Sequence, residues 1–118
     1  MTREELKAVA ETMIAQLGGN KFVAMTGAKD FLFGATEGND PYVQFKIPAN
    51  FAKDNISIIK ILLNQMDTYD VEYLKVGKKK NDFGGFSPVA ELVAKSEGIY
   101  CDMLADDFKE KTGLETNL

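Results

Sequence analysis

The chain has 118 residues, which is the length of one domain and enough to bury a hydrophobic core. It carries 14 basic and 18 acidic side chains, and this formal net charge of −4 does not indicate a general nucleic-acid-binding protein. The sequence has no histidine and a single cysteine, Cys101. This composition excludes catalytic sites that need a histidine, zinc sites that need imidazoles or several thiolates, and an internal disulfide.

The composition also gives an expected location. No apolar run reaches the roughly 18 residues that a membrane-spanning helix needs. The first residues, MTREELKAVAETMIAQLGG, are charged and amphipathic, unlike a secretory signal peptide. A lone cysteine is typical of a reducing compartment. We therefore expect a cytoplasmic protein with no membrane partner.

The first predicted element is a helix that begins near Thr2. Thr2 and Glu5 form the Thr-x-x-Glu pattern of a capping box, and one glycine of Gly18-Gly19 is expected to form the left-handed cap at the other end. Apolar side chains recur between these points at helical spacing: Leu6, Val9, Ala10, Met13, Ile14 and Leu17. We expect this apolar face to cover a sheet.

Three short strands are predicted next, at residues 21–26, 31–35 and 42–47. Turn-forming residues separate them at 27–30 and 37–41, and Pro48 ends the third. In the third strand Val43, Phe45 and Ile47 would share one face. The pattern predicts a three-stranded meander.

Residues 56–63 and 69–76 are predicted to form an antiparallel hairpin at the centre of the sheet. The first strand is a nearly continuous apolar run, rich in β-branched side chains. A helix over 56–66 is the alternative, because Lys60 and Asn64 lie four residues apart, but four isoleucines within six positions disfavour it. In the second strand, alternation would place on one face Tyr69, Val71, Tyr73 and Lys75.

The remaining residues predict a long loop and a second helix. Residues 77–88, GKKKNDFGGFSP, have no periodic pattern and are predicted to form an exposed, mobile loop. Residues 89–95 fit a short helix or a short strand. Helical spacing returns over 100–111 and would place on one face Cys101, Leu104, Ala105 and Phe108. Gly113 would end this helix, and Leu114 would fold back onto it.

These elements predict one α+β domain over residues 1–118. We expect an antiparallel sheet of about five strands, with an N-terminal and a C-terminal helix packed on one face.

The leading functional hypothesis is a surface that binds single-stranded nucleic acid. Cations that neutralise phosphates, beside rings that stack on bases, are the parts of such a surface. The lysines of 75–80 precede Phe83 and Phe86, and two tyrosines share a predicted strand face with the first lysine. The hypothesis assigns binding, with no metal and no cofactor, to Tyr69, Tyr73, Lys75, Lys78, Lys79 and Lys80. The alternative is a solvated loop whose lysines keep it soluble and whose phenylalanines tuck beneath it.

The other candidates have simpler explanations. The acidic residues four apart in the second helix are typical of the solvent-exposed face of a surface helix: Asp102, Asp106 and Glu110. The acids around the central hairpin turn could ligate Mg²⁺ only if the backbone brought them together: Asp67, Asp70 and Glu72. Cys101 lies on the apolar face of its helix and is predicted to be a buried structural cysteine.

Three stretches resemble small hypothetical proteins of bacteriophages and bacterial mobile elements. They are FVAMTGAKD (22–30), LNQMDTYDVEYLKV (63–76) and GIYCDMLADDFKEKTGL (98–114), in that order along the chain. The family brings no assigned activity and no functional residues. The resemblance implies a phage or prophage setting, which favours a nucleic-acid-associated or host-interaction role.

We therefore expect an accessory binding protein of phage or mobile-element DNA or RNA metabolism, and not an enzyme. The alternative is a protein-interaction or structural module without nucleic-acid binding. Such a module could be a homodimer formed through a sheet edge or through the aromatic sheet face.

Overall fold

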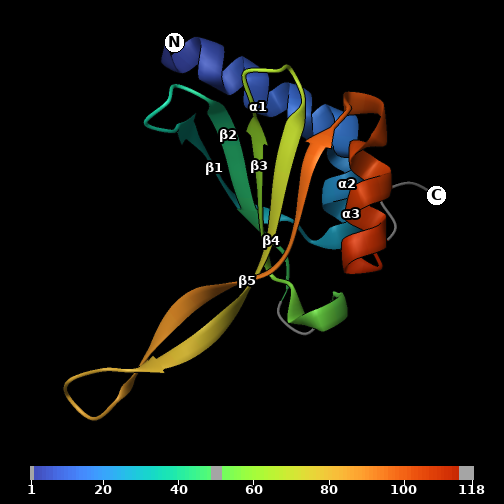
Figure 1. The fold of residues 1–118 in the computed structure, drawn as a ribbon. Coiled ribbons are helices and arrows are strands. Elements are labelled where there is room, and N and C mark those ends of the chain that lie inside the picture. Colours follow the sequence, from blue (N-terminus) through green and yellow to red (C-terminus); the bar gives the residue numbers. More distant parts are fainter. Residues whose placement is uncertain (1, 49–51, 115–118) are drawn as a thin grey trace.

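The protein, seen in a computed structural model that describes residues 2–48 and 52–114, is built on one antiparallel sheet. Within these ranges the sheet has five strands in the order β1-β2-β3-β4-β5, so that neighbours in sequence are neighbours in space (Figure 1). The strands are β1 (Lys29–Ala35), β2 (Pro41–Lys46), β3 (Ile58–Leu63), β4 (Tyr69–Lys80) and β5 (Phe86–Ile99).

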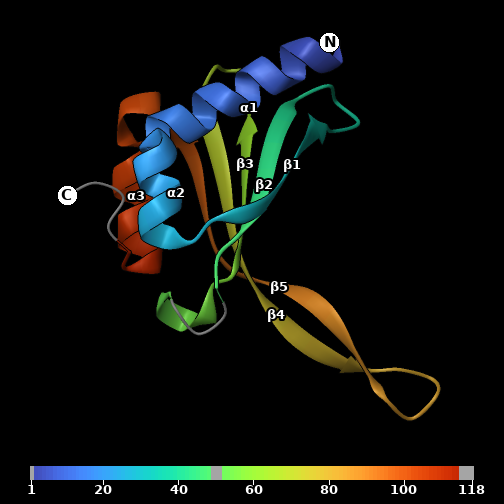
Figure 2. The same cartoon turned by 180° about the vertical axis from the view of Figure 1, so that it is seen from behind.

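The helices of the described residues lie on one face of this sheet and leave the other face without a helical cover (Figures 1 and 2). They are α1 (Arg3–Leu17), α2 (Gly19–Thr26) and α3 (Leu104–Thr112), with the single turns η1 (Lys53–Asn55) and η2 (Cys101–Met103). The predicted α+β class is confirmed, with an N-terminal and a C-terminal helix on an antiparallel sheet of five strands.

Helix α1 begins and ends where the sequence predicts. The Thr2 hydroxyl accepts a hydrogen bond from the Glu5 backbone N–H at 3.2 Å and contacts the Glu5 carboxylate at 3.1 Å. Gly18 follows the helix with a φ of 133°, and its N–H donates to the Ala15 carbonyl. The buried side chains of the helix are Ala10, Met13 and Leu17, all from the predicted apolar face.

The prediction of a strand at 21–26 is wrong, because these residues form α2. The chain re-enters a helix directly after Gly18, and Gly27 ends it in the left-handed conformation at φ 71°. From this helix Phe22 reaches the centre of the core, where its ring lies edge-on to Phe45 at 5.5 Å and to Phe108 at 5.1 Å. A short apolar run fits a strand or a helix, and here packing decides between them.

The predicted central hairpin is present. β3 is the third of the five strands and pairs with β4 from Ile58 opposite Leu74 to Leu63 opposite Tyr69, which rules out the helix alternative. Asn64 holds the turn, since its side-chain oxygen accepts hydrogen bonds from the backbone N–H groups of Met66 and Thr68.

The prediction of a loop at 77–88 is corrected by the structure. β4 continues to Lys80 and β5 begins at Phe86, so that only 81–85 form a turn. β3 pairs with β4 no further than Leu74, and beyond that point β4 has β5 as its one strand partner in the described sheet. The two strands therefore leave the body as a ribbon (Figures 1 and 2), which we call the arm and define as residues 75–92. Of the two interpretations of 89–95, the strand is correct.

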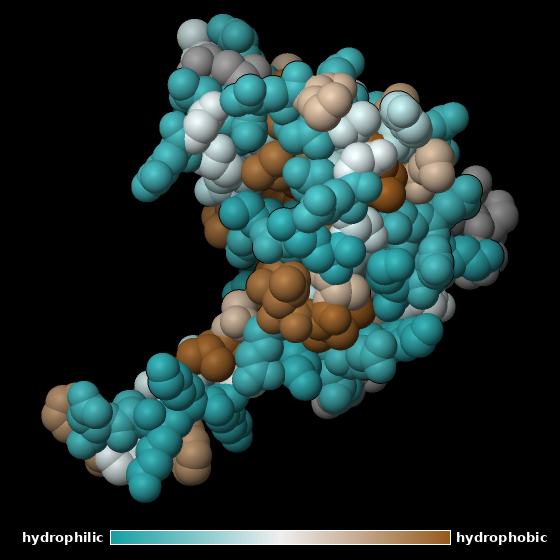
Figure 3. All heavy atoms as spheres, in the orientation of Figure 1, coloured by the Kyte–Doolittle hydropathy of each residue, from teal (hydrophilic) through white to brown (hydrophobic). Residues whose placement is uncertain are grey.

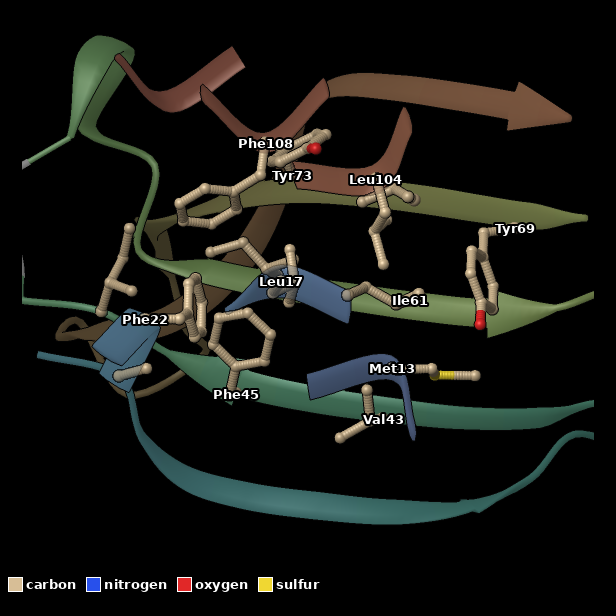
Figure 4. Close-up of a cluster of buried hydrophobic side chains, with 14 of the residues drawn as sticks. Met13, Leu17, Phe22, Val43, Phe45, Ile61, Tyr69, Tyr73, Leu104 and Phe108 are labelled. Atoms are coloured by element: carbon tan, nitrogen blue, oxygen red, sulfur yellow. The ribbon is translucent and has the colours of Figure 1, made fainter. Parts of the chain in front are cut away.

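The hydrophobic core lies between the helices and the covered sheet face. Figure 4 shows its side chains pointing toward one another from both layers. The largest fully buried ones are Met13, Leu17, Phe22, Val43, Phe45, Ile56, Ile59, Ile61, Val71, Tyr73, Leu104 and Phe108. No helix in the described ranges has both the length and the apolar character needed to span a bilayer.

Candidate functional site

The arm carries the predicted lysines, and the structure keeps most of them exposed. Lys78, Lys79 and Lys80 are exposed, and none of them pairs with a carboxylate of the described residues. Lys75, at the base, is partly buried, and its Nζ lies 3.8 Å from Glu91 Oε2. Successive side chains of a strand point to opposite faces, so that Lys78 and Lys80 lie on one face of the ribbon and Lys79 lies on the other. The arm thus presents cations on both faces.

The arm is a basic projection on an acidic body. Residues 75–92 contain four lysines against two acids, Asp82 and Glu91, a formal charge of +2. The rest of the chain contains 10 basic and 16 acidic side chains, a formal charge of −6. The total of −4 therefore conceals two regions of opposite sign, which attract different partners.

Tyr69 and Tyr73 do not belong to this surface. Both side chains point into the core (Figure 4), with exposures of 6% for Tyr69 and 0% for Tyr73. The Tyr69 hydroxyl donates to Gln16 Oε1 at 2.5 Å, and the Tyr73 hydroxyl donates to Asp107 Oδ2 at 2.6 Å. The predicted alternation is correct, but the face that it assigns to these tyrosines is the one that the helices cover. Neither ring can stack on a base.

The surroundings of the two tyrosines keep both hydroxyls protonated. Burial raises the pKa of Tyr69 above its ordinary value. Burial also raises the pKa of Tyr73, and its hydrogen bond to the Asp107 carboxylate raises that pKa further. These hydroxyls act as structural hydrogen-bond donors.

Asp107 is a residue whose role the sequence analysis missed. Its Oδ2 accepts the Tyr73 hydroxyl, and its Oδ1 accepts the Ser96 hydroxyl at 2.8 Å. One carboxylate thus ties α3 to both β4 and β5. Asp107 sits among other acids of a surface helix, and its spacing carries no signal that sets it apart from them.

The phenylalanines of the arm are exposed and do not tuck beneath it, so that part of the solvated-loop alternative is wrong. Phe83 lies in the terminal turn and is 97% exposed, and Phe86 is 69% exposed. Figure 3 shows the arm as a separate projection with hydrophobic residues at its far end. Phe83 is the most exposed large hydrophobic residue of the described ranges.

A cavity of about 370 Å³ lies at the other end of β4, between α1, the β3–β4 turn and η2. Its lining is mostly apolar and comes from Ala8, Val9, Thr12, Gln16, Leu63, Asp67, Tyr69 and Cys101. Cys101 is exposed here, which corrects the prediction of a buried cysteine. It lies in the η2 turn before α3, so that the helical spacing that placed it on the apolar face does not apply.

Among the acids around the β3–β4 turn, Asp70 has a structural role. Asp70 Oδ1 accepts hydrogen bonds from the Asn64 side-chain amide and from the Gly98 backbone N–H, both at 3.1 Å. Among the residues that the structure describes, no three acids or thiols are grouped so that they could hold a metal ion.

A hydrophobic strip crosses the uncovered sheet face where the arm leaves the body. Cross-strand pairing places Ile58 beside Leu74 and Leu74 beside Leu92, and Val76 continues the strip onto the arm. Figure 3 shows hydrophobic residues gathered at this point. Of the aromatic residues of the sheet, which the homodimer alternative used, Phe45, Tyr69 and Tyr73 are buried under the helices, and this strip is an apolar surface that the sheet exposes.

Comparison of the chain with protein-family models, with curated proteins and with solved structures gave no match.

Proposed function

We propose that the protein binds nucleic acid through the arm, as a cytoplasmic accessory protein of phage or mobile-element DNA or RNA metabolism. The observation that carries the proposal is the placement of charge. Lys78, Lys79 and Lys80 stand on a projecting ribbon with charge +2, while the body has charge −6. Phosphates are attracted to the arm and repelled by the body, so that binding is confined to the arm.

The shape of the arm fits this role. A two-stranded ribbon is narrow enough to enter the major groove of a duplex or to lie along a single strand. The exposed lysines are point charges that contact phosphates without reading bases. With Tyr69 and Tyr73 in the core, binding rests on this electrostatic attraction, and we expect it to be salt-dependent and tolerant of sequence.

The test is a double charge reversal on the arm, Lys78→Glu with Lys79→Glu. We expect the variant to bind short single-stranded DNA or RNA several-fold more weakly than the wild type at low salt, because two attractive lysine–phosphate pairs become repulsive. The slope of log affinity against log salt should fall by about one for each lysine that no longer neutralises a phosphate. Fluorescence anisotropy at low and at physiological salt measures both quantities, for single strands and for duplexes.

A matched control separates the effect of the arm from that of total charge. Lys7→Glu with Lys29→Glu changes the net charge by the same amount, at two exposed positions of the body. This control should keep nearly the wild-type affinity. Equal losses in the two variants, or no wild-type binding even at low salt, would contradict the proposal and favour the protein-interaction module.

A further inference from the structure

The arm presents an exposed aromatic side chain on a turn whose backbone is fixed by hydrogen bonds. Phe83 is 97% exposed at the tip. Asn81 fixes the turn, since its side-chain oxygen accepts hydrogen bonds from the N–H groups of Phe83 and Gly85 at 3.0 and 3.1 Å. The Asn81 N–H also donates to the Gly85 carbonyl at 2.9 Å. A turn whose backbone is held in this way loses little backbone conformational entropy when its side chain enters a partner.

The body has a cavity whose size and lining suit an aromatic side chain. The cavity beside α1 has a volume of about 370 Å³ and a mostly apolar lining. This volume lies within the range of about 300–1,000 Å³ that is typical of binding pockets, and it accommodates one aromatic ring. The exposed Asp67 adds a carboxylate to the lining, beside which a cationic segment can lie.

The tip and the cavity of one chain cannot meet. Tyr69, at the start of β4, lines the cavity, and Lys80, at the end of the same strand, leads into the tip. The eleven residue steps between them span about 36 Å of extended strand. Figures 1 and 2 both show the arm leaving the sheet at the end opposite to the β3–β4 turn. An interaction between tip and cavity must therefore join two copies.

We propose that the tip of the arm docks in the cavity of a second copy of this chain. Phe83 fills the cavity, and the charge of +2 on the arm meets the charge of −6 on the body. The interface uses two different surfaces, so that a docked pair keeps one unused cavity on one copy and one unused tip on the other. Such a heterologous interface propagates into open chains or closed rings. The inference goes beyond phosphate binding, and it would make coating of a nucleic acid cooperative.

The first test uses one variant on each side of the interface. Phe83→Ala removes the tip side chain, and Ala8→Trp fills the cavity from an exposed position of α1. We expect the wild-type mass to rise above 13.0 kDa as protein concentration increases and to fall back as salt increases. Each variant should remain at 13.0 kDa. Sedimentation velocity or light scattering after gel filtration measures the masses.

The controls distinguish loss of docking from loss of folding and from nonspecific hydrophobic association. Leu32→Ala removes another exposed hydrophobic side chain, 60% exposed on β1, and should assemble like the wild type. Thermal unfolding checks that every variant is folded. Anisotropy with Ala8→Trp, which keeps all arm lysines, reports phosphate binding separately, so that failure of assembly and failure of the proposed function are distinguishable.

Mixing the two variants gives the decisive result. Phe83→Ala keeps a usable cavity and Ala8→Trp keeps a usable tip, so that an equimolar mixture should form a complex of twice the single-chain mass and grow no further. A wild type that stays monomeric at every concentration overturns the inference. Assembly of Phe83→Ala or of Ala8→Trp to the wild-type extent also overturns it.

Discussion

At the scale of single residues, Tyr73 shows how one side chain can be a candidate binding residue in the sequence and a structural residue in the fold. Its ring is fully buried, and its hydroxyl is one of two that converge on Asp107. The bond is partly buried, and a carboxylate oxygen that loses its donor in such a place is costly, so that this hydrogen bond matters more for stability than an exposed one. Tyr69 is likewise a buried tyrosine whose hydroxyl donates a structural hydrogen bond, with Gln16 as the acceptor.

We expect Tyr73→Phe to lower the free energy of unfolding at neutral pH by about 1.5–3 kcal/mol, the range for hydrogen bonds to charged groups. The ring is kept, so that the loss reports the hydroxyl and the Asp107 oxygen that it leaves without this donor. Urea unfolding at neutral pH measures the change. Tyr100→Phe, at a side chain that is 62% exposed, is the control and should stay within about 0.5 kcal/mol of the wild type.

The same tyrosines predict loss of stability at alkaline pH. Their pKa values are raised in the folded protein above the ordinary value of 10.0, so that below pH 10.0 both states keep the proton and the full stability is present. Above pH 10.0 the unfolded chain loses protons that the folded chain retains, and stability falls by up to about 1.4 kcal/mol per pH unit for each buried tyrosine.

Tyr73→Phe removes one of these two groups. Its free energy of unfolding should therefore decline less steeply than that of the wild type between about pH 10 and pH 11.5, the range in which an unfolded tyrosine ionises. Urea unfolding across this range measures both slopes. Equal slopes would show that Tyr73 does not carry the alkaline loss.

At the scale of elements, β4 and β5 form a hairpin whose outer part, the arm, contributes no buried hydrophobic side chain to the core. None of the buried hydrophobic residues lies within 75–92. Pairing with β3 stops at Leu74, and an extra β5 residue, Val93, shifts the register at the same point, since Tyr73 pairs with Ala94 and Leu74 pairs with Leu92. Bulges of this kind bend a strand, which fits the place where the ribbon leaves the sheet.

An arm-shortened variant tests this separation. Gly77 and Val89 pair across the arm, so that an Asn-Gly turn between them can replace 78–88. We expect the free energy of unfolding to change by less than about 1 kcal/mol, because the core keeps all of its side chains. Nucleic-acid binding and self-association should both disappear. A variant that unfolds cooperatively near the wild-type temperature but still binds nucleic acid would place the binding surface on the body.

At the scale of the whole molecule, the core supports folding, and we assign binding to the arm and the cavity. The helices and the covered sheet face form the core, while the arm and the cavity lie at opposite ends of β4 and face solvent. A basic arm on an acidic body also discourages nucleic acid from lying on the helices. Both proposals use the positive charge of the arm, the first to attract phosphates and the second to bring the tip to the acidic body, and Phe83 serves the second alone.

The sequence by itself determined the elements whose signals are local. Thr2 with Glu5 and the following apolar spacing predicted α1, the isoleucines and the Asn64 turn predicted the β3–β4 hairpin, and Gly113 marked the end of α3, where its N–H donates to the Lys109 carbonyl. Each of these signals lies within a few residues of the structure that it predicts, and local propensity was enough.

The tertiary structure alone decided the rest. Alternation in β4 divides its side chains into two sets but does not say which set the helices cover, and Tyr73 was therefore misplaced. The helix at 19–26, the length of the arm and the link from Asp107 to Ser96 depend on partners distant in sequence or on pairing that no local pattern encodes. The cavity joins α1, the β3–β4 turn and η2, and only the packing of these elements brings them together.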